Sequence, residues 1–276
     1  MTCSARSLTV RFGSTLALDD VSVTVEPGSV VVVVGGDGAG KTTLLRSVVG
    51  EVRLESGTVV APDPQGIGYL PATAGSWPAL TVRQNMDFVG GIYGLTGERL
   101  RSRREELLAR AGLSAAADRP ASQLSGGMRR KLGFSMTMLH EPPLLVLDEP
   151  TTGVDPVSRI DLWRLVSEAA ASGAAVLMST TYLDEAERAA TLLALDGGRT
   201  LAQGTLEQVL GALPGTVTHS DRQFRPEWAW RRGRVHHEYW PDGERPPDGA
   251  VPATADLEDV VVALSLRRRH DSGAAA

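Results

Sequence analysis

Residues 30–42 read VVVVVGGDGAGKT: a run of five valines, then a glycine-rich loop that ends in a lysine and a threonine. A continuous β-branched run predicts a strand that is buried on both faces. The pattern that begins at Lys41 predicts a helix as far as about Gly50. Strand, loop and helix in this order are the setting in which the pattern G-x-x-x-x-G-K-[ST] marks a phosphate-binding loop.

This loop supplies the residues that we expect to bind a nucleotide. Glycines let backbone N–H groups turn inward around phosphate oxygens, and the helix start adds its positive end. Lys41 is expected to contact the β- and γ-phosphates, and the Thr42 hydroxyl to bind Mg²⁺. A glycine-rich turn with a chance lysine is the alternative, which the flanking strand and helix disfavour. The candidate residues are Gly35, Gly36, Asp37, Gly38, Ala39, Gly40, Lys41, Thr42 and Thr43.

Two acidic residues, Asp148 and Glu149, follow a second apolar run at residues 144–147. A carboxylate at the carboxyl end of a strand faces the ligand crevice of an open α/β sheet. Asp148 is therefore expected to hold Mg²⁺ together with Thr42, mostly through water. Glu149 is the candidate catalytic residue, because a carboxylate there would orient or deprotonate the attacking water. Acidic residues are common at strand ends, so the pair alone is only a moderate indication of a magnesium site. The phosphate-binding loop in the same sequence makes that interpretation strong.

A third motif, LSGGM at residues 124–128, lies about a helix length before the acidic pair. Ser125, Gly126 and Gly127 can present backbone N–H groups and a hydroxyl to a γ-phosphate at a helix start. The alternative is an ordinary N-cap serine before a glycine turn. The spacing to the acidic pair favours the phosphate-binding interpretation.

The three motifs in this order resemble the ATP-binding subunits of ABC (ATP-binding cassette) transporters, over about residues 7–210. Residues 81–86 and 182–187 are similar to stretches of the drug- and antibiotic-export (daunorubicin-resistance-like) branch. The resemblance implies Mg-ATP hydrolysis, and it places Phe12 where the family has an aromatic ring that stacks on adenine. It also implies that two subunits pair head to tail, so that each ATP lies between the loop of one subunit and the LSGGM motif of the other.

The chain departs from that family at positions that usually carry catalytic side chains. Ala72 stands where the family has a glutamine, Thr181 where it has a histidine, and Asp37 where asparagine is common. Alanine offers no polar group, and threonine is shorter than imidazole and carries no charge. Losing one such preorganised group typically costs about 10²–10³ in rate. We hypothesise that this site binds ATP but turns over slowly; adequate hydrolysis through Glu149 is the alternative.

Alternating strands and helices predict a largely parallel sheet with helices on both faces. With the resemblance, the expected fold class is α/β: a P-loop NTPase (RecA-like) core, an inserted α-helical subdomain, an antiparallel β subdomain and a small C-terminal extension. We expect the ABC ATP-binding domain at residues 1–214, its helical subdomain at about 81–140, and the extension at 215–276. A helix is expected over residues 156–171, because a proline opens an apolar helical pattern there.

The expected extension is rich in arginine, tryptophan and histidine. Such a mixture can bind single-stranded nucleic acid, but a small β-rich unit with its own aromatic core is favoured. His236 and His237 have no nearby cysteine or second histidine pair, so no metal site is expected there. An amphipathic stretch covers residues 256–264, and residues 267–276 are expected to be a frayed tail.

Arginines crowd the expected helical subdomain and alternate with glutamates. A solvent-exposed helix face with salt bridges is the favoured interpretation. The family resemblance offers the alternative of a docking surface for cytoplasmic loops of a membrane subunit. The arginines are Arg99, Arg101, Arg103, Arg104 and Arg110.

The composition is that of an ordinary globular protein. The 276 residues are 42% apolar and 22% charged, with a formal net charge of −5. A negative net charge argues against a broad nucleic-acid surface, so no nucleic-acid partner is expected. Cys3 is the only cysteine, which excludes an internal disulfide and suits a reducing cytoplasm. No apolar run approaches the roughly 18 residues that span a bilayer.

The resemblance therefore implies a peripheral protein at the cytoplasmic face of the cell membrane, which works with separate transmembrane permease subunits. A second ABC ATP-binding subunit is the other expected partner, and the gaps at Ala72 and Thr181 favour a heterodimer over a homodimer. The alternative function is a soluble non-transport ABC ATPase in translation or repair. Such proteins usually carry a second cassette or long coiled coils, and this sequence shows neither. A binding-only regulatory subunit is a third alternative, which the presence of Glu149 disfavours.

Overall fold

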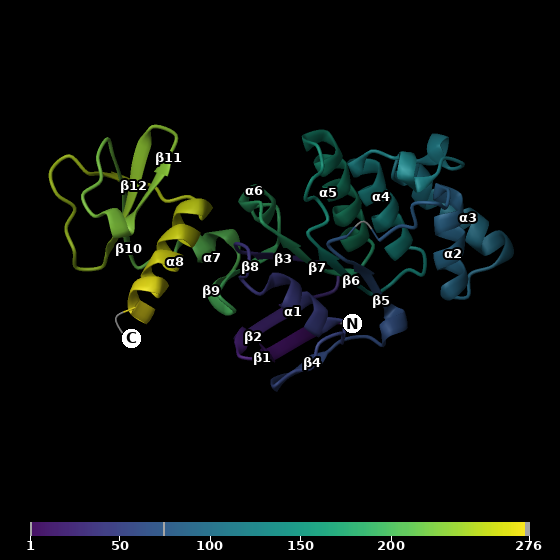
Figure 1. Cartoon of the computed structure of the whole chain (residues 1–276), viewed down its shortest axis with the longest axis horizontal. Helices are drawn as coiled ribbons and strands as arrows, with labels where there is room; N and C mark the ends of the chain where they lie inside the picture. Colours follow the sequence, from purple (N-terminus) through teal and green to yellow (C-terminus); the bar gives the residue numbers. More distant parts are fainter. Residues whose placement is uncertain (1, 74, 274–276) are drawn as a thin grey trace.

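A computed structural model describes residues 2–73 and 75–273, and within these ranges the strands form three sheets (Figure 1). The largest sheet has six strands in the order β5-β6-β7-β3-β8-β9. All neighbours are parallel except β8 and β9. The strands are β3 (Val30–Val34), β5 (Ile67–Leu70), β6 (Leu144–Asp148), β7 (Ala175–Thr180), β8 (Thr191–Asp196) and β9 (Arg199–Gly204).

The five valines form β3, between β7 and β8, and all five are buried. This confirms the expected buried strand. The phosphate-binding loop follows directly, and α1 (Lys41–Val48) begins at the lysine. Because β3 is in the interior of the sheet, the loop emerges over its centre, where the carboxyl ends of the neighbouring strands also lie.

A smaller antiparallel sheet covers one face of this core. It has the order β2-β1-β4, with β1 (Cys3–Phe12), β2 (Thr15–Val25) and β4 (Ser56–Val60). Its buried side chains share one apolar cluster with α1 and with one face of β3, β6 and β7. The sheet therefore fixes α1 against the main sheet, and it brings the β1–β2 hairpin close to the phosphate-binding loop.

Helices cover the other face of the main sheet and extend beyond its β5 edge (Figure 1). The insertion contains α2 (Val82–Ile92), α3 (Gly97–Arg110) and α4 (Gly126–Thr137). Next to it lies α5 (Pro156–Ala171), whose bounds match the predicted helix. Two short helices, α6 (Leu183–Ala186) and α7 (Leu206–Leu210), follow β7 and β9.

Four arginines of α3 make salt bridges, as the favoured interpretation predicts, but one of the four, Arg104, is buried and not on a solvent-exposed face. Arg103 Nη1 is 2.8 Å from Glu106 Oε2, and Arg110 Nη2 is 3.0 Å from the carboxylate of Glu168 on α5. Arg104 is buried and pairs with Asp87 of α2. The ion pairs of Arg104 and Arg110 connect α3 to α2 and α5, so these two arginines contribute to packing within the helical region.

The C-terminal region forms the third sheet, in the antiparallel order β11-β12-β10-β13. Trp228, Tyr239 and Ala263 form a small apolar core beside it, which fits the β-rich interpretation of this region. Its elements are β10 (Gly215–Ser220), β11 (Ala229–Arg232), β12 (Val235–Pro241), β13 (Val251–Ala253) and α8 (Leu257–Gly273).

The expectation of a frayed tail from residue 267 is wrong as far as residue 273, because α8 continues to Gly273. Arg268 donates a hydrogen bond to the carbonyl oxygen of Asp196 on β8, so the charged end of the helix is fastened to the main sheet. Residues 274–276 of the expected tail lie outside the described residues.

The first turn of α8 also contacts the main core, because Leu257 and Val260 belong to the large apolar cluster of the main sheet. The division into residues 1–214 and 215–276 therefore stays a prediction, although β10 begins at Gly215. None of the helices within residues 2–73 and 75–273 has the length and hydropathy that a bilayer span requires.

Candidate functional site

The phosphate-binding loop lines a cleft of about 330 Å³ at the carboxyl end of the main sheet. Residues 36–43 form one wall, Thr15, Leu16 and Ala17 of β2 form another, and Glu149 reaches in from the end of β6. The structure thus brings Glu149 to the loop across more than a hundred residues of sequence. Such a concave site with convergent polar groups has the character of a small-molecule site.

Lys41 is held by its own loop. Its Nζ donates to the carbonyl oxygens of Gly35 at 2.8 Å and Gly36 at 3.2 Å, and it lies 3.3 Å from Glu149 Oε1. The side chain is only 5% exposed, so its charge is concentrated at the floor of the cleft. A buried ammonium requires such partners, and phosphate oxygens are stronger partners than carbonyl oxygens.

Gly40, the N-cap of α1, shows why the loop requires glycine. Its φ is +103°, in a region that L side chains rarely adopt. A Cβ atom there would lie 2.8 Å from the carbonyl oxygen of Ala17 and 2.9 Å from Leu18 Cδ2. The helix therefore starts in close contact with β2, and its backbone N–H groups point into the cleft region, where anions are favoured.

Thr42 and Asp148 are brought together as expected for a magnesium site. Thr42 Oγ1 donates to Asp148 Oδ1 at 3.2 Å, and Asp148 is almost fully buried. Hydroxyl and carboxylate oxygens are the ligands that Mg²⁺ prefers. Ser179, opposite Asp148 in the β6–β7 register, donates its Oγ hydrogen to the same Oδ1 at 2.6 Å. The residues present therefore fit the ion.

Ser179 is a residue whose role the sequence did not indicate. Its hydroxyl also accepts the backbone N–H of Glu149 at 2.9 Å, so it orients both acidic residues. A serine at the end of an apolar strand carries no distinct pattern. Its neighbourhood follows only from the pairing of β6 with β7.

Glu149 has an unusual backbone conformation, with φ of +46°. A non-glycine residue in the left-handed region costs about 1–3 kcal/mol and is typical of functional sites. The Thr152 hydroxyl donates to Glu149 Oε2 at 3.1 Å, while Oε1 faces Lys41. The sharp turn after β6 thus directs the carboxylate into the cleft with both oxygens held.

Two of the three positions that depart from the family pattern, Ala72 and Thr181, are exposed just after the ends of β5 and β7. The backbone around Ala72 is nevertheless fixed, because the buried Arg130 of α4 donates to three successive carbonyls. Its guanidinium is 3.1 Å from Pro71 O and 3.0 Å from Thr73 O, and it also contacts Ala72 O. Burial lowers the pKa of Arg130, and the nearby Asp148 and Glu149 oppose this shift.

The LSGGM residues lie apart from this cleft, since none of them lines it. Ser125 is the N-cap of α4, and its Oγ accepts the Met128 N–H at 3.2 Å, as the N-cap alternative predicts. Ser125 and Gly126 are exposed. Gly127 is buried against α5, where an added Cβ would lie 2.6 Å from Ser158 Cβ. The helix start is thus open to another molecule and is not available to this chain's own cleft.

Phe12 ends β1 and pairs with Thr15, which lines the cleft. The ring itself is not part of the lining, and Phe12 is 52% exposed. This aromatic ring therefore stands at the rim of the cleft. Its expected contact with adenine stays a prediction.

Comparison with known proteins gives a consistent result. The ABC transporter family model matches residues 18–152. The daunorubicin resistance ATP-binding protein DrrA2 of Streptomyces coeruleorubidus is 39% identical, and the match covers 98% of this chain and 87% of that protein. A solved structure of an ATP-binding subunit of an ABC transporter has a TM-score of 0.69 at 28% identity, covering 76% of this chain and 92% of that one.

A second relative is much longer than this chain. The probable multidrug ABC transporter ATP-binding protein YbhF of Escherichia coli (strain K12) is 39% identical over 209 residues. The match covers 72% of this chain, which spans about a third of the relative's length (36%).

These comparisons confirm the resemblance and the P-loop NTPase fold class, and they do not favour a non-transport ATPase. Members of this family bind and hydrolyse ATP, and their ATP-binding subunits dimerise and work with transmembrane subunits. This chain belongs to the ABC transporter family of ATPases, and it is similar to ATP-binding proteins named for daunorubicin resistance and multidrug transport.

Proposed function

We propose that this chain is the ATP-binding subunit of a drug or antibiotic exporter, which acts at the cytoplasmic face of the membrane through separate transmembrane permease subunits. The observation that carries the proposal is the convergence of Lys41, Thr42, Asp148 and Glu149 on one cleft. The similarity to a daunorubicin resistance protein over 98% of the chain supports export as the coupled process.

ATP bound in the cleft changes the partners of Lys41. Phosphate oxygens compete with the Gly35 and Gly36 carbonyls and with Glu149 for the ammonium, and the charge-assisted bonds to phosphate are stronger. The backbone N–H groups of the loop and of the α1 start bind the remaining oxygens. Glu149 is thereby released from its ion pair and becomes available to water.

Thr42 and Asp148 would hold the magnesium ion. When bound, Mg²⁺ supplies charge neutralisation and orientation of the phosphates. Ser179 keeps Asp148 Oδ1 in place, and the same hydroxyl fixes the backbone of Glu149. Glu149 then accepts the proton of the attacking water, with Thr152 holding one of its oxygens.

A second cassette completes the site in this proposal. The start of α4 at Ser125 and Gly126 is exposed and does not line the chain's own cleft, which suits phosphate binding in a partner. Ala72 and Thr181 leave this chain's cleft with fewer polar groups, so we favour a heterodimer in which the other cleft turns over faster. A homodimer that hydrolyses ATP through Glu149 is the alternative.

The ATPase rate of the purified chain tests this proposal, at concentrations high enough for dimers to form. The rate is compared with that of Glu149→Gln and of the double variant Ala72→Gln/Thr181→His. A nearly inactive native chain that the double variant accelerates manyfold supports a weakened cleft and a heterodimer. A brisk native rate that only Glu149→Gln removes supports a homodimer.

The transport function has a separate test. We expect the native protein to fractionate with membranes and to copurify with a permease subunit and a second cassette. Recovery with ribosomes would support the non-transport alternative. Deletion of the second cassette should reduce export, and unchanged export after that deletion would contradict the heterodimer.

A further inference from the structure

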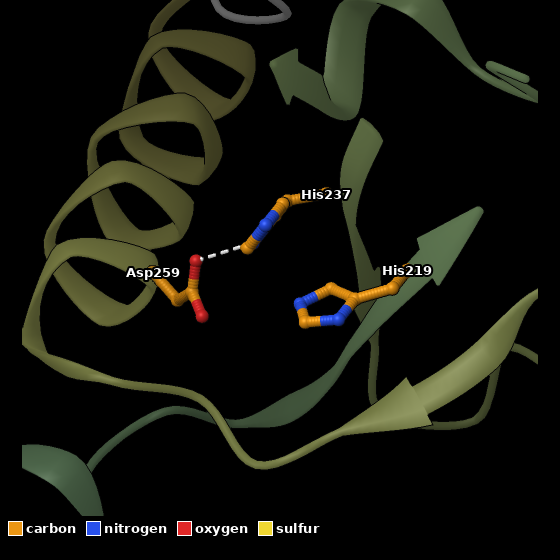
Figure 2. A group of neighbouring side chains, drawn as sticks. All are labelled: His219, His237 and Asp259. Atoms are coloured by element: carbon orange, nitrogen blue, oxygen red, sulfur yellow. Dashed lines mark hydrogen bonds and ion pairs between the residues drawn. The ribbon is translucent and has the colours of Figure 1, made fainter. Parts of the chain in front are cut away.

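The C-terminal sheet brings together two histidines that are 18 positions apart in the sequence. His219 of β10 and His237 of β12 are directly opposite in the antiparallel register, with ring centroids 4.0 Å apart. Directly opposed residues project from the same face of a sheet. Asp259, in the first turn of α8, packs against this face. Figure 2 shows its carboxylate and the two imidazole rings turned toward a common space.

Each of the three residues offers a donor atom to this space. His237 Nδ1 is 2.7 Å from Asp259 Oδ1, and the ligand atoms of the whole group lie within 4.8 Å of one another. His219 Nε2 is buried and has no hydrogen-bond partner within the part of the chain that the structure describes. Buried polar atoms normally have a hydrogen-bond partner, because a buried donor or acceptor without one is destabilising.

The carboxylate of Asp259 is held by the start of α8. Its Oδ2 accepts the backbone N–H of Asp256 at 3.3 Å, and its own N–H donates to Asp256 Oδ1 at 3.0 Å. This reciprocal pair is a capping arrangement that fixes the first turn of the helix. Outer hydrogen bonds of this kind orient the ligands of metal sites.

Arg232 is the one cation close to this group in the described part of the chain, and it has other partners. Its Nη1 is 3.3 Å from Asp259 Oδ1, but the guanidinium also lies 2.7 Å from Asp256 and 3.2 Å from Glu258. It keeps both of these contacts if Asp259 turns to another cation. Three carboxylates around one guanidinium leave a negative surplus, which favours a bound cation.

We propose that His219, His237 and Asp259 form a zinc site that fastens α8 to the sheet of β10 and β12. Two imidazoles and one carboxylate are a donor set for zinc, with water as the fourth ligand. Ligand atoms around tetrahedral zinc lie about 3.3 Å apart, given bond lengths of about 2.0–2.2 Å. The ligand atoms lie within 4.8 Å of one another, so the widest gap closes by about 1.5 Å at most when the ion binds. The ion takes the place of the hydrogen on His237 Nδ1, and the neutral ring then carries its single hydrogen on Nε2.

The neighbouring His236 supplies a matched control. It follows the same strand but projects from the opposite face, because successive residues of a strand alternate. The adjacent histidines at 236 and 237 therefore cannot both bind one ion. The sequence predicts no metal site at these two histidines, and the present proposal departs from that prediction for His237. The partner of His237 is His219, which only the register of β10 and β12 identifies.

Isothermal titration of zinc into the full-length chain, stripped of metal and free of nucleotide, tests the proposal. We expect one zinc ion per native chain and an affinity at least about tenfold lower in His219→Ala and Asp259→Asn. His236→Ala should bind as the native chain does. All four proteins have the same nucleotide cleft, so zinc bound there contributes equally to each titration.

Two further measurements separate loss of the site from loss of folding. Circular dichroism should be the same for all variants, and zinc should raise the melting temperature of the native chain but not of His219→Ala. Cobalt in place of zinc should give the visible absorption of a tetrahedral site in the native chain and in His236→Ala only. The proposal would be overturned if His219→Ala bound zinc as tightly as the native chain. It would also be overturned if His236→Ala lost as much zinc affinity as His219→Ala.

Discussion

At the scale of single residues, the cleft depends on side chains that hold each other. Glu149 adopts a left-handed backbone, and its N–H, Oε1 and Oε2 are engaged by Ser179, Lys41 and Thr152. These contacts offset the conformational cost of about 1–3 kcal/mol. The carboxylate is thus held in the cleft, as the proposed proton transfer requires.

Replacement of this residue gives the first prediction. Glu149→Gln keeps the shape and the contact with Thr152 but removes the base, so ATP hydrolysis should fall by about 10²–10⁴. Nucleotide binding, measured with a fluorescent ATP analogue, should persist. Glu187→Gln, at an exposed position after α6, is the control and should keep the native rate. If Glu149→Gln hydrolysed ATP at a rate near that of Glu187→Gln, Glu149 would not be the base that accepts the proton of water.

The single thiol gives a second prediction. Burial raises the pKa of Cys3 to about 11, from an ordinary value of 9.0. Because only the thiolate reacts, two pKa units leave about one hundredth of the reactive form near pH 8. Iodoacetamide should therefore modify the native chain far more slowly than the chain in urea, as followed by mass spectrometry. Equal rates in the two states would show that Cys3 is accessible.

At the scale of elements, a buried carboxylate joins α5, α6 and the turn that follows Glu149. Glu185 of α6 accepts hydrogen bonds from Thr151 at 2.9 Å and Thr180 at 2.7 Å, and Arg159 Nε of α5 is 3.1 Å away. Glu185 is almost fully buried. The charge is therefore tolerated only while Arg159 balances it.

We expect Arg159→Met to lower the free energy of unfolding by about 3–5 kcal/mol, because it leaves a buried charge unpaired. Arg164→Met on the same helix removes an exposed ion pair with Glu168 and should cost no more than about 1 kcal/mol. Urea denaturation of both variants measures the difference. Equal costs would mean that the buried Glu185 carboxylate does not depend on Arg159.

Another contact between elements is sensitive to pH. His140, after α4, stacks on Tyr93 at the end of α2 with ring centroids 3.6 Å apart. Burial lowers the pKa of His140 below the ordinary value of 6.5. The unfolded chain then binds the proton more tightly, so the stability linked to this group is complete above about pH 7 and declines as the pH falls through 6.5.

His140→Phe keeps the stacking and removes the titration. The free energy of unfolding of this variant should decline less between pH 7.5 and pH 5.5 than that of the native chain, by urea denaturation at each pH. A residual decline is expected, since burial also lowers the pKa of His219. Parallel pH profiles would show that His140 is not protected from protonation in the folded state.

Elements with strong local patterns were predictable from the sequence, and others were not. The valine run of β3 and the proline-started α5 match their predicted bounds. β2 begins at Thr15, well before the alternation at residues 21–25, because pairing with β1 extends it. The charged end of α8 resembles a solvated tail, but its contact with Asp196 comes from a strand some seventy residues away.

At the scale of the whole molecule, α8 connects the C-terminal sheet with the cassette, as Figure 1 shows. Leu257 and Val260 lie in the main apolar cluster, while Ala263 packs with Trp228 and Tyr239 of the C-terminal core. Contacts of this kind depend on pairing across distant segments. Local sequence patterns do not predict such contacts, because the residues that meet are far apart in the sequence. The same holds for the grouping of His219 with Asp259.

Because α8 contacts both parts, we expect a destabilising substitution in α8 to lower the stability of the ATP-binding domain as well. Leu257→Ala should lower the free energy of unfolding by about 2–5 kcal/mol and shift the melting of the whole chain to lower temperature. Val251→Ala, at an exposed position of β13, should have an effect within about 0.5 kcal/mol. Calorimetry of both variants checks this. A second, unshifted transition in Leu257→Ala would show that the C-terminal region melts independently.

Arg130 donates hydrogen bonds to the carbonyl oxygens of Pro71, Ala72 and Thr73. These bonds limit what a substitution at residue 72 can change in the structure. Every amino acid carries the same backbone carbonyl oxygen, so this contact between α4 and the segment after β5 does not depend on the side chain at residue 72. Alanine in place of the family's glutamine therefore removes a polar side chain but keeps the backbone contact by which α4 holds the segment after β5.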